Sequence, residues 1–90
     1  MESKIEIIQI NISGEDKPGM TSSLTDILAR YDAFILDIGQ ANIHQSLTLG
    51  ILFMTTSDKS GAILKELLFK ASELGVMIRF TLITEEHYQA

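Results

Sequence analysis

The residues best suited to hold a ligand lie close together in the segment GEDKPGM, residues 14–20. Turn residues fill this segment, and the apolar patterns on either side predict that it joins a strand to a helix. The first free backbone N–H groups of that helix, from Gly19, Met20 and Thr21, can then point at an anion. Asp16 can accept a hydrogen bond from an ammonium group. The segment therefore suits a zwitterionic amino acid.

The same segment also has a simpler explanation. A Pro-Gly turn is a common way to begin a helix. Pro18 then sits in the first helical turn, where its missing N–H costs nothing, and Asp16 or Lys17 lies at the cap. From the residue types alone, a ligand loop and an ordinary helix start both remain open.

Catalytic and metal-binding patterns are absent from the sequence. His44 and His87 lie far apart and lack the i, i+4 or cysteine-rich spacing of metal ligands. Two pairs of carboxylates occur, but the members of each pair are adjacent, so their side chains do not face one site. Phosphate-binding loops and nucleophile motifs do not occur either. We therefore expect no catalytic residue, metal or cofactor, and no enzyme activity from this chain alone.

Length and composition indicate one small domain. The 90 residues are 46% apolar and 21% charged, as in an ordinary globular protein. A chain of this size buries only about 60 to 65% of its unfolded surface, so its core is marginal without a well-packed interior or a partner. The absence of cysteine excludes disulfides and suits a reducing compartment.

The number and distribution of charged residues argue against two classes of binding partner. Seven basic residues against twelve acidic ones give a net charge of −5, and the basic residues are scattered along the chain. Binders of nucleic acid or anionic membranes would gather lysine and arginine on one face. No apolar run approaches the roughly 20 residues of a membrane span, and the first residues do not resemble a signal peptide. We therefore expect a soluble, cytoplasmic protein without nucleic acid or membrane partners.

Hydrophobic periodicity predicts four elements in the first part of the chain. Residues 5–12 are rich in isoleucine and read as a strand. Apolar residues at i, i+3, i+4 and i+7 over residues 24–31 indicate an amphipathic helix. The dense Ile, Leu and Phe of residues 34–54 divide into two antiparallel strands, with a short turn at Gln45-Ser46.

Two further elements follow. Residues 62–74 form the stronger amphipathic pattern, with Ser60 as the expected N-cap and Gly75 as the left-handed residue at its end. Alternating apolar residues over 76–82 predict a last strand. The order βαββαβ predicts an α+β, ferredoxin-like fold, in which a four-stranded antiparallel sheet carries two helices on one face. We expect the domain to occupy residues 1–84, with residues 85–90 as a tail or the start of a linker.

The uncovered face of this sheet should be polar if it meets water. Yet the middle strands carry apolar or small residues at both parities. Leu47, Leu49, Ile51 and Phe53 fall on one face, Leu52 and Met54 fall on the other, and Gly39, Ala41, Gly50, Met77 and Ile83 add small or apolar surface. An exposed patch of this kind usually marks an interface. The alternative is that strand ends or loops cover these residues.

Two segments of the chain resemble an ACT domain, a ferredoxin-like regulatory module. GEDKPGMTSSLTDILA is similar to the strand-loop-helix segment of the family. ILDIGQANIHQSLTLGILF looks like the two middle strands of the amino-terminal ACT domain of bacterial phosphoserine phosphatases. The resemblance covers roughly residues 4–84.

This resemblance implies a non-catalytic module of serine biosynthesis that binds a small amino acid, with serine as the first candidate, and regulates an attached phosphoserine phosphatase. It also implies a homodimer or packing against a neighbouring domain, with the ligand between the first loop of one copy and the second strand of its partner. By position, the ligand-binding residues are Asp16, Pro18, Gly19 and Met20 on the loop and Asp37, Ile38, Gly39 and Gln40 on the strand. Because the nucleophile motif DxDxT of the phosphatase is absent, the chain is either a fragment of a longer enzyme or a free-standing ACT protein. The alternative function is an oligomerisation module without a small-molecule ligand.

Overall fold

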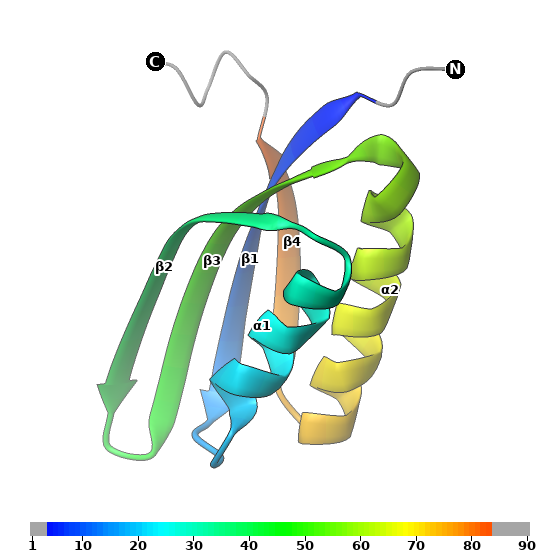
Figure 1. The fold of residues 1–90 in the computed structure, drawn as a ribbon. Coiled ribbons are helices and arrows are strands. Elements are labelled where there is room, and N and C mark those ends of the chain that lie inside the picture. The colour runs from blue at the N-terminus through cyan, green and yellow to red at the C-terminus, as the bar shows by residue number, and fades with distance from the viewer. Residues whose placement is uncertain (1–3, 84–90) are drawn as a thin grey trace.

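The computed structural model describes residues 4–83, and it has the predicted order of six elements. These are β1 (Ile5–Glu15), α1 (Met20–Arg30), β2 (Phe34–Ile43), β3 (Ser46–Thr56), α2 (Ser57–Leu74) and β4 (Met77–Ile83). The strands form one sheet in the order β2-β3-β1-β4, and every neighbouring pair is antiparallel. Both helices lie on the same face of the sheet (Figure 1). The predicted α+β, ferredoxin-like fold is therefore confirmed.

The core lies between the helices and the sheet, and strand alternation explains its composition. Every second residue points toward the helices and is buried from Ile8 to Ile12 in β1 and from Leu47 to Thr55 in β3, while the residues between them point to the other side. The largest fully buried side chains are Phe53, Ile10, Ile12, Met20, Leu24, Ile27, Leu28, Leu47, Leu49, Ile51, Ile63 and Leu67. The alternation predicted for residues 47–53 is thus correct. We call the other side of the sheet, which no helix covers, the outer face.

The edge strand β2 is less covered than the central strands. Nine of its ten residues are exposed, and only Leu36 is partly buried. Leu36 has no partner in the pairing with β3, which passes from Ile35 opposite Phe53 to Asp37 opposite Leu52. This β-bulge changes which residues of the strand face the helices.

Several predicted boundaries are wrong, each for a local reason. The turn between β2 and β3 lies at His44 and Gln45, not at Gln45-Ser46, because His44 adopts the positive φ (57°) that the tight turn needs, and Ser46 already pairs in β3. The helix α2 begins at Ser57, with extended Thr56 at its N-cap. Ser60 therefore lies in the first turn, where its hydroxyl donates to the carbonyl of Ser57.

Other predicted positions are correct or differ from the structure by a few residues. Gly75 is left-handed (φ 72°) at the end of α2, as expected. The strands β1 and β4 end three residues and one residue later than the sequence pattern predicts. Pro18 precedes α1 rather than lying within its first turn, because the left-handed Gly19 (φ 75°) takes the N-cap position. The expected tail, residues 85–90, lies outside the described residues.

Polar contacts also join the two helices. Arg30 of α1 forms an ion pair with Glu66 of α2 at 3.4 Å. A hydrogen bond to the Glu66 carboxylate raises the pKa of Tyr31 above its ordinary value. Within residues 4–83, no helix is long and apolar enough to cross a membrane, and no three His, Asp or Glu side chains gather in a way that could hold a metal ion.

Candidate functional site

Two contacts hold the loop between β1 and α1 against the end of α2. Gly14 packs so closely on Val76 that a Cβ atom at residue 14 would lie 2.7 Å from the Val76 Cγ1 atom. The ammonium group of Lys17 donates a hydrogen bond to the backbone carbonyl of Leu74, in the last turn of α2. A cation is favourable there, because the last carbonyls of a helix carry partial negative charge. The end of β1 and the loop that follows it are therefore both held against the end of α2.

A chain of hydrogen bonds joins this loop to β2 and α1. The Thr21 hydroxyl donates to Gln40 Oε1 at 3.2 Å, and Gln40 Nε2 donates to Asn42 Oδ1 at 3.0 Å. The Asn42 amide then donates to the Asp16 carboxylate at 2.8 Å. We call these four residues the loop–β2 corner. The loop, the start of α1 and the end of β2 thus present one continuous polar surface.

The helix α1 begins at this corner without a side-chain cap. The Met20 N–H donates to the Lys17 carbonyl at 3.3 Å, so the expectation that this group is free is wrong. The backbone N–H groups of Thr21 and Ser22 have no hydrogen-bond partner among residues 4–83. Two unpaired donors at a helix N-terminus attract an anion such as a carboxylate.

The electrostatics of the corner suit an ammonium group as well. The Asp16 carboxylate is exposed and accepts its hydrogen bond from Asn42. It forms no ion pair within the described part of the chain, because Lys17, the adjacent cation, is turned toward α2. Asp16 therefore keeps an unpaired negative charge that could accept a ligand cation.

The structure divides the predicted site residues between different places. On the loop, Asp16 belongs to the corner, Pro18 and Gly19 lie in the exposed turn that precedes α1, and the Met20 side chain is buried in the core. On β2, Gln40 contacts Thr21, and Ile38 points to the same helix-covered side of the sheet.

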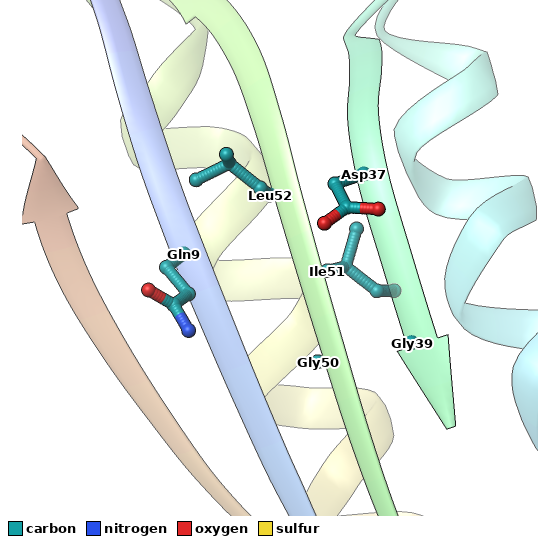
Figure 2. A pocket seen from close by; sticks show the side chains of 6 residues that line it. All are labelled: Gln9, Asp37, Gly39, Gly50, Ile51 and Leu52. Atoms are coloured by element: carbon teal, nitrogen blue, oxygen red, sulfur yellow. The ribbon is translucent and has the colours of Figure 1, made fainter. Parts of the chain in front are cut away.

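The Asp37 side chain points the other way, and together with Gly39 it lines a hollow of about 290 Å³ on the outer face (Figure 2). Gly39 lies opposite Gly50 in the strand pairing, and the absence of two side chains leaves the hollow open. Gln9 and Leu52 form its other sides. The eight predicted residues therefore do not form a single site within one copy of the chain.

The sequence singled out neither Asn42 nor the side-chain hydroxyl of Thr21 as ligand-binding, and only the backbone N–H of Thr21 was expected to bind. Strand alternation could have predicted the place of Asn42, because Asn42 lies two residues after Gln40 and the two side chains therefore point to the same face of the strand. The contact of Thr21 with β2 could not be predicted in this way, because it depends on how α1 lies relative to β2, and no local sequence pattern gives that.

A second hollow, of about 440 Å³, lies farther along the outer face. It is lined by Asn11, Ile12, Ser13, Thr48, Met77, Ile78 and Arg79. Met77 is 74% exposed, and at the far end of the sheet Phe34 is 62% exposed. The outer face thus carries exposed apolar side chains as predicted, together with two hollows.

Fold and corner together define a class of protein. The model of the ACT domain family matches residues 6–81, and the chain belongs to this family. ACT domains are regulatory, non-catalytic modules that bind small ligands. The exposed polar corner agrees with that class.

Individual relatives resemble parts of this chain. Phosphoserine phosphatase SerB2 of Mycobacterium tuberculosis is 38% identical over 52 residues, which are 58% of this chain and 12% of that protein. This chain therefore matches a small part of the length of its relative. The predicted resemblance to the ACT domain of phosphoserine phosphatases is confirmed.

Solved structures share the fold. An ACT domain protein from Streptococcus pneumoniae superposes with a TM-score of 0.72 at 20% identity, over 86% of this chain and 89% of that one. A formyltetrahydrofolate deformylase from Burkholderia mallei gives a TM-score of 0.75 at 11% identity, over 84% of this chain and 28% of the other. At such identities these likenesses show the fold alone.

Proposed function

We propose that the chain binds a small amino acid at the loop–β2 corner, with serine as the first candidate, and thereby regulates an attached phosphoserine phosphatase. The observation that carries the proposal is the pairing of opposite binding groups at one place. The free N–H groups of Thr21 and Ser22 can hold a carboxylate, and the unpaired Asp16 charge can hold an ammonium group. The exposed amides of Gln40 and Asn42 could contact a side-chain hydroxyl.

The corner is open to solvent, and this limits how tightly one copy of the chain could bind an amino acid there. Asp16, Gln40 and Asn42 are all exposed, whereas small-molecule sites usually bury about 70 to 90% of the ligand. We therefore propose that a second copy or an adjoining domain supplies the missing wall. The Mycobacterium tuberculosis relative, a phosphoserine phosphatase, supports that enzyme as the regulated partner.

Calorimetric titration with the twenty amino acids tests the ligand. We expect heat with serine or a similarly small amino acid. Asp16→Asn removes the charge and should weaken binding roughly 5- to 150-fold, as expected for a loss of about 1 to 3 kcal/mol. Asp26→Asn is the matched control, because Asp26 is exposed on α1 outside the corner. The absence of heat with every amino acid, for the chain and for the full enzyme that contains it, would refute the proposal.

Regulation needs its own measurement. In the full-length phosphatase, serine should change the rate of phosphoserine hydrolysis, and Asp16→Asn should remove that response while leaving the rate without serine unchanged. A response to serine that is equal in both proteins would place the regulatory site elsewhere.

A second candidate function is self-association through the outer face. An apolar row crosses this face from the exposed Phe34 through Met54 and Ile7 to Ile83. Contiguous apolar surface of this kind often marks an interface. Sedimentation over a range of concentrations should show a dimer. A chain that is still monomeric at high micromolar concentration would contradict this candidate.

A further inference from the structure

We propose that two copies of the chain pack through their outer faces around a two-fold axis, so that Arg79 of each copy enters the Gly39–Gly50 hollow of the other and pairs with the partner's Asp37. This inference rests on the second candidate function and adds the contact surface, its orientation and its ion pairs. It does not depend on amino-acid binding at the corner.

The charges of the outer face are the first argument. Over the paired rows of the sheet from Ile7 to Ser13, the two charged residues on this face are Asp37 on β2 and Arg79 on β4. Both are exposed, and neither forms an ion pair within residues 4–83. Three strand spacings of about 4.8 Å separate the two edge strands, so the charges lie too far apart to pair within one copy.

The symmetry of the strand order is the second argument. Arg79, Asn11, Gly50 and Gly39 occupy one row across the sheet, and Asp37 lies in the next row. A two-fold axis parallel to the strands reverses the strand order and keeps the rows, so it places β4 of one copy over β2 of the other. Arg79 then lies above Gly39.

The partner's Asp37 is two residues away from that point, or about 7 Å along the strand, which an arginine side chain can span. An axis across the strands would instead place β2 over β2 and bring like charges together. The charge pattern therefore selects the first arrangement, in which two identical ion pairs form.

The shape of the surface is the third argument. Gly39 and Gly50 leave the 290 Å³ hollow without side chains on its floor, and a Cβ atom at residue 39 would have no heavy atom within 4 Å. The Asp37 carboxylate and the Gln9 amide lie at its sides (Figure 2). A planar guanidinium group suits such a space, because it can donate several hydrogen bonds while its faces contact apolar atoms.

The size of the surface sets the expected strength. Four strands about 4.8 Å apart and rows about 3.4 Å apart give a flat patch of roughly 20 by 24 Å. This is below the roughly 800 Å² per partner of a standard stable interface. We therefore expect a weak dimer with a dissociation constant in the micromolar range, which added salt weakens further because its ion pairs are only partly shielded from water.

Charge reversal with rescue tests the proposal by sedimentation equilibrium at low salt. Each substitution changes the net charge by two, so D37R takes it from −5 to −3 and R79D takes it from −5 to −7. We expect both to weaken the dimer at least tenfold, although they move the net charge in opposite directions. The double variant D37R/R79D should restore the dimer.

A mixture of the two single variants should form the heterodimer, which native mass spectrometry with one isotope-labelled variant detects. The matched control is K65D, because Lys65 is exposed on α2, in the other layer of the molecule, and it should leave the dimer unchanged. Thermal unfolding checks that each variant is folded.

Three outcomes would overturn the inference. These are a wild-type chain that stays monomeric at high micromolar concentration, single variants that dimerise as the wild type does, and a double variant that fails to recover although it is folded. Amino-acid binding is titrated in the same wild-type samples. Binding without a dimer would refute only this inference. A dimer without binding would leave this inference intact, and the ligand proposal would then be refuted if the full enzyme also binds no amino acid.

Discussion

The side-chain amide of Asn42 donates a hydrogen bond of 2.8 Å to the carboxylate of Asp16, across 26 residues of sequence. This contact ties the end of β2 to the loop that begins α1. It also fixes one carboxylate oxygen of Asp16 and leaves the rest of the group exposed. The orientation of the proposed ammonium acceptor thus depends on a neighbouring strand.

Asn42→Leu tests that dependence. The substitution keeps the approximate size of the side chain and removes the donor to Asp16, so we expect amino-acid affinity to fall about tenfold. Stability should fall by only about 0.5 to 1.5 kcal/mol, because the lost hydrogen bond is exposed. Titration calorimetry and urea unfolding measure the two effects. Ser72→Ala, on the exposed side of α2, should change neither, and unchanged affinity in Asn42→Leu would remove Asn42 from the site.

Gly14→Ala should destabilise the fold by about 1 to 3 kcal/mol, because its methyl group would lie 2.7 Å from Val76 Cγ1 in a packed contact. Gly61→Ala is the matched control, since a Cβ atom there meets nothing within 4 Å and the residue lies inside α2. It should stabilise the protein by about 0.5 to 1 kcal/mol. Equal unfolding free energies for the two variants would show that the loop can move away from Val76.

Two substitutions of Gly19 distinguish the effect of backbone strain on stability from the effect of an added side chain on ligand binding. Its φ of 75° is unfavourable for residues with a Cβ atom, by about 1 to 2 kcal/mol, and more so for β-branched valine. Asparagine tolerates this conformation better. We expect Gly19→Val and Gly19→Asn both to reduce amino-acid binding, because each adds a side chain beside the free N–H groups.

In thermal unfolding, Gly19→Asn should retain more stability than Gly19→Val. If the asparagine variant binds as the wild type does, the ligand does not approach the backbone at this point.

Lys17→Met should destabilise the protein by about 0.5 to 1.5 kcal/mol, because it removes the hydrogen bond and the cation at the end of α2. Hydrogen exchange should rise first at the amide of Gly75, which bonds to the carbonyl of Ser72 in the last turn of the helix. Lys70→Met is the comparison, since Lys70 forms only a partly exposed ion pair with Glu73, and its cost should be near zero. Equal costs for the two variants would show that the Lys17 contact contributes little.

Periodicity predicted the fold well, because one-sided burial leaves a clear pattern in the sequence. The alternation of residues 47–53 and the left-handed Gly75 are confirmed for this reason. The sequence pattern places this turn one residue too late, since positive φ is uncommon for any residue except glycine and no glycine marks position 44.

The orientation of residues 37–40 could not be read from the sequence, and the bulge at Leu36 is the cause. Strict alternation from Ile35, which points to the helix side, would turn Asp37 to that side as well. The unpaired Leu36 reverses the phase, so Asp37 and Gly39 face outward while Ile38 and Gln40 face the helices. One inserted residue in a strand exchanges its two faces. No residue type in this segment predicts the insertion.

The bulged strand also has a thermodynamic consequence. Consecutive residues of β2 serve the two proposed surfaces, with Gln40 and Asn42 at the corner and Asp37 and Gly39 on the outer face. The surfaces share no side chain, but they share one backbone. If a bound amino acid changes the twist of β2, it changes the dimerisation constant, and dimerisation must then change amino-acid affinity by the same factor. Through this one edge strand, a rise in protein concentration and a rise in ligand concentration would then shift the same coupled equilibrium.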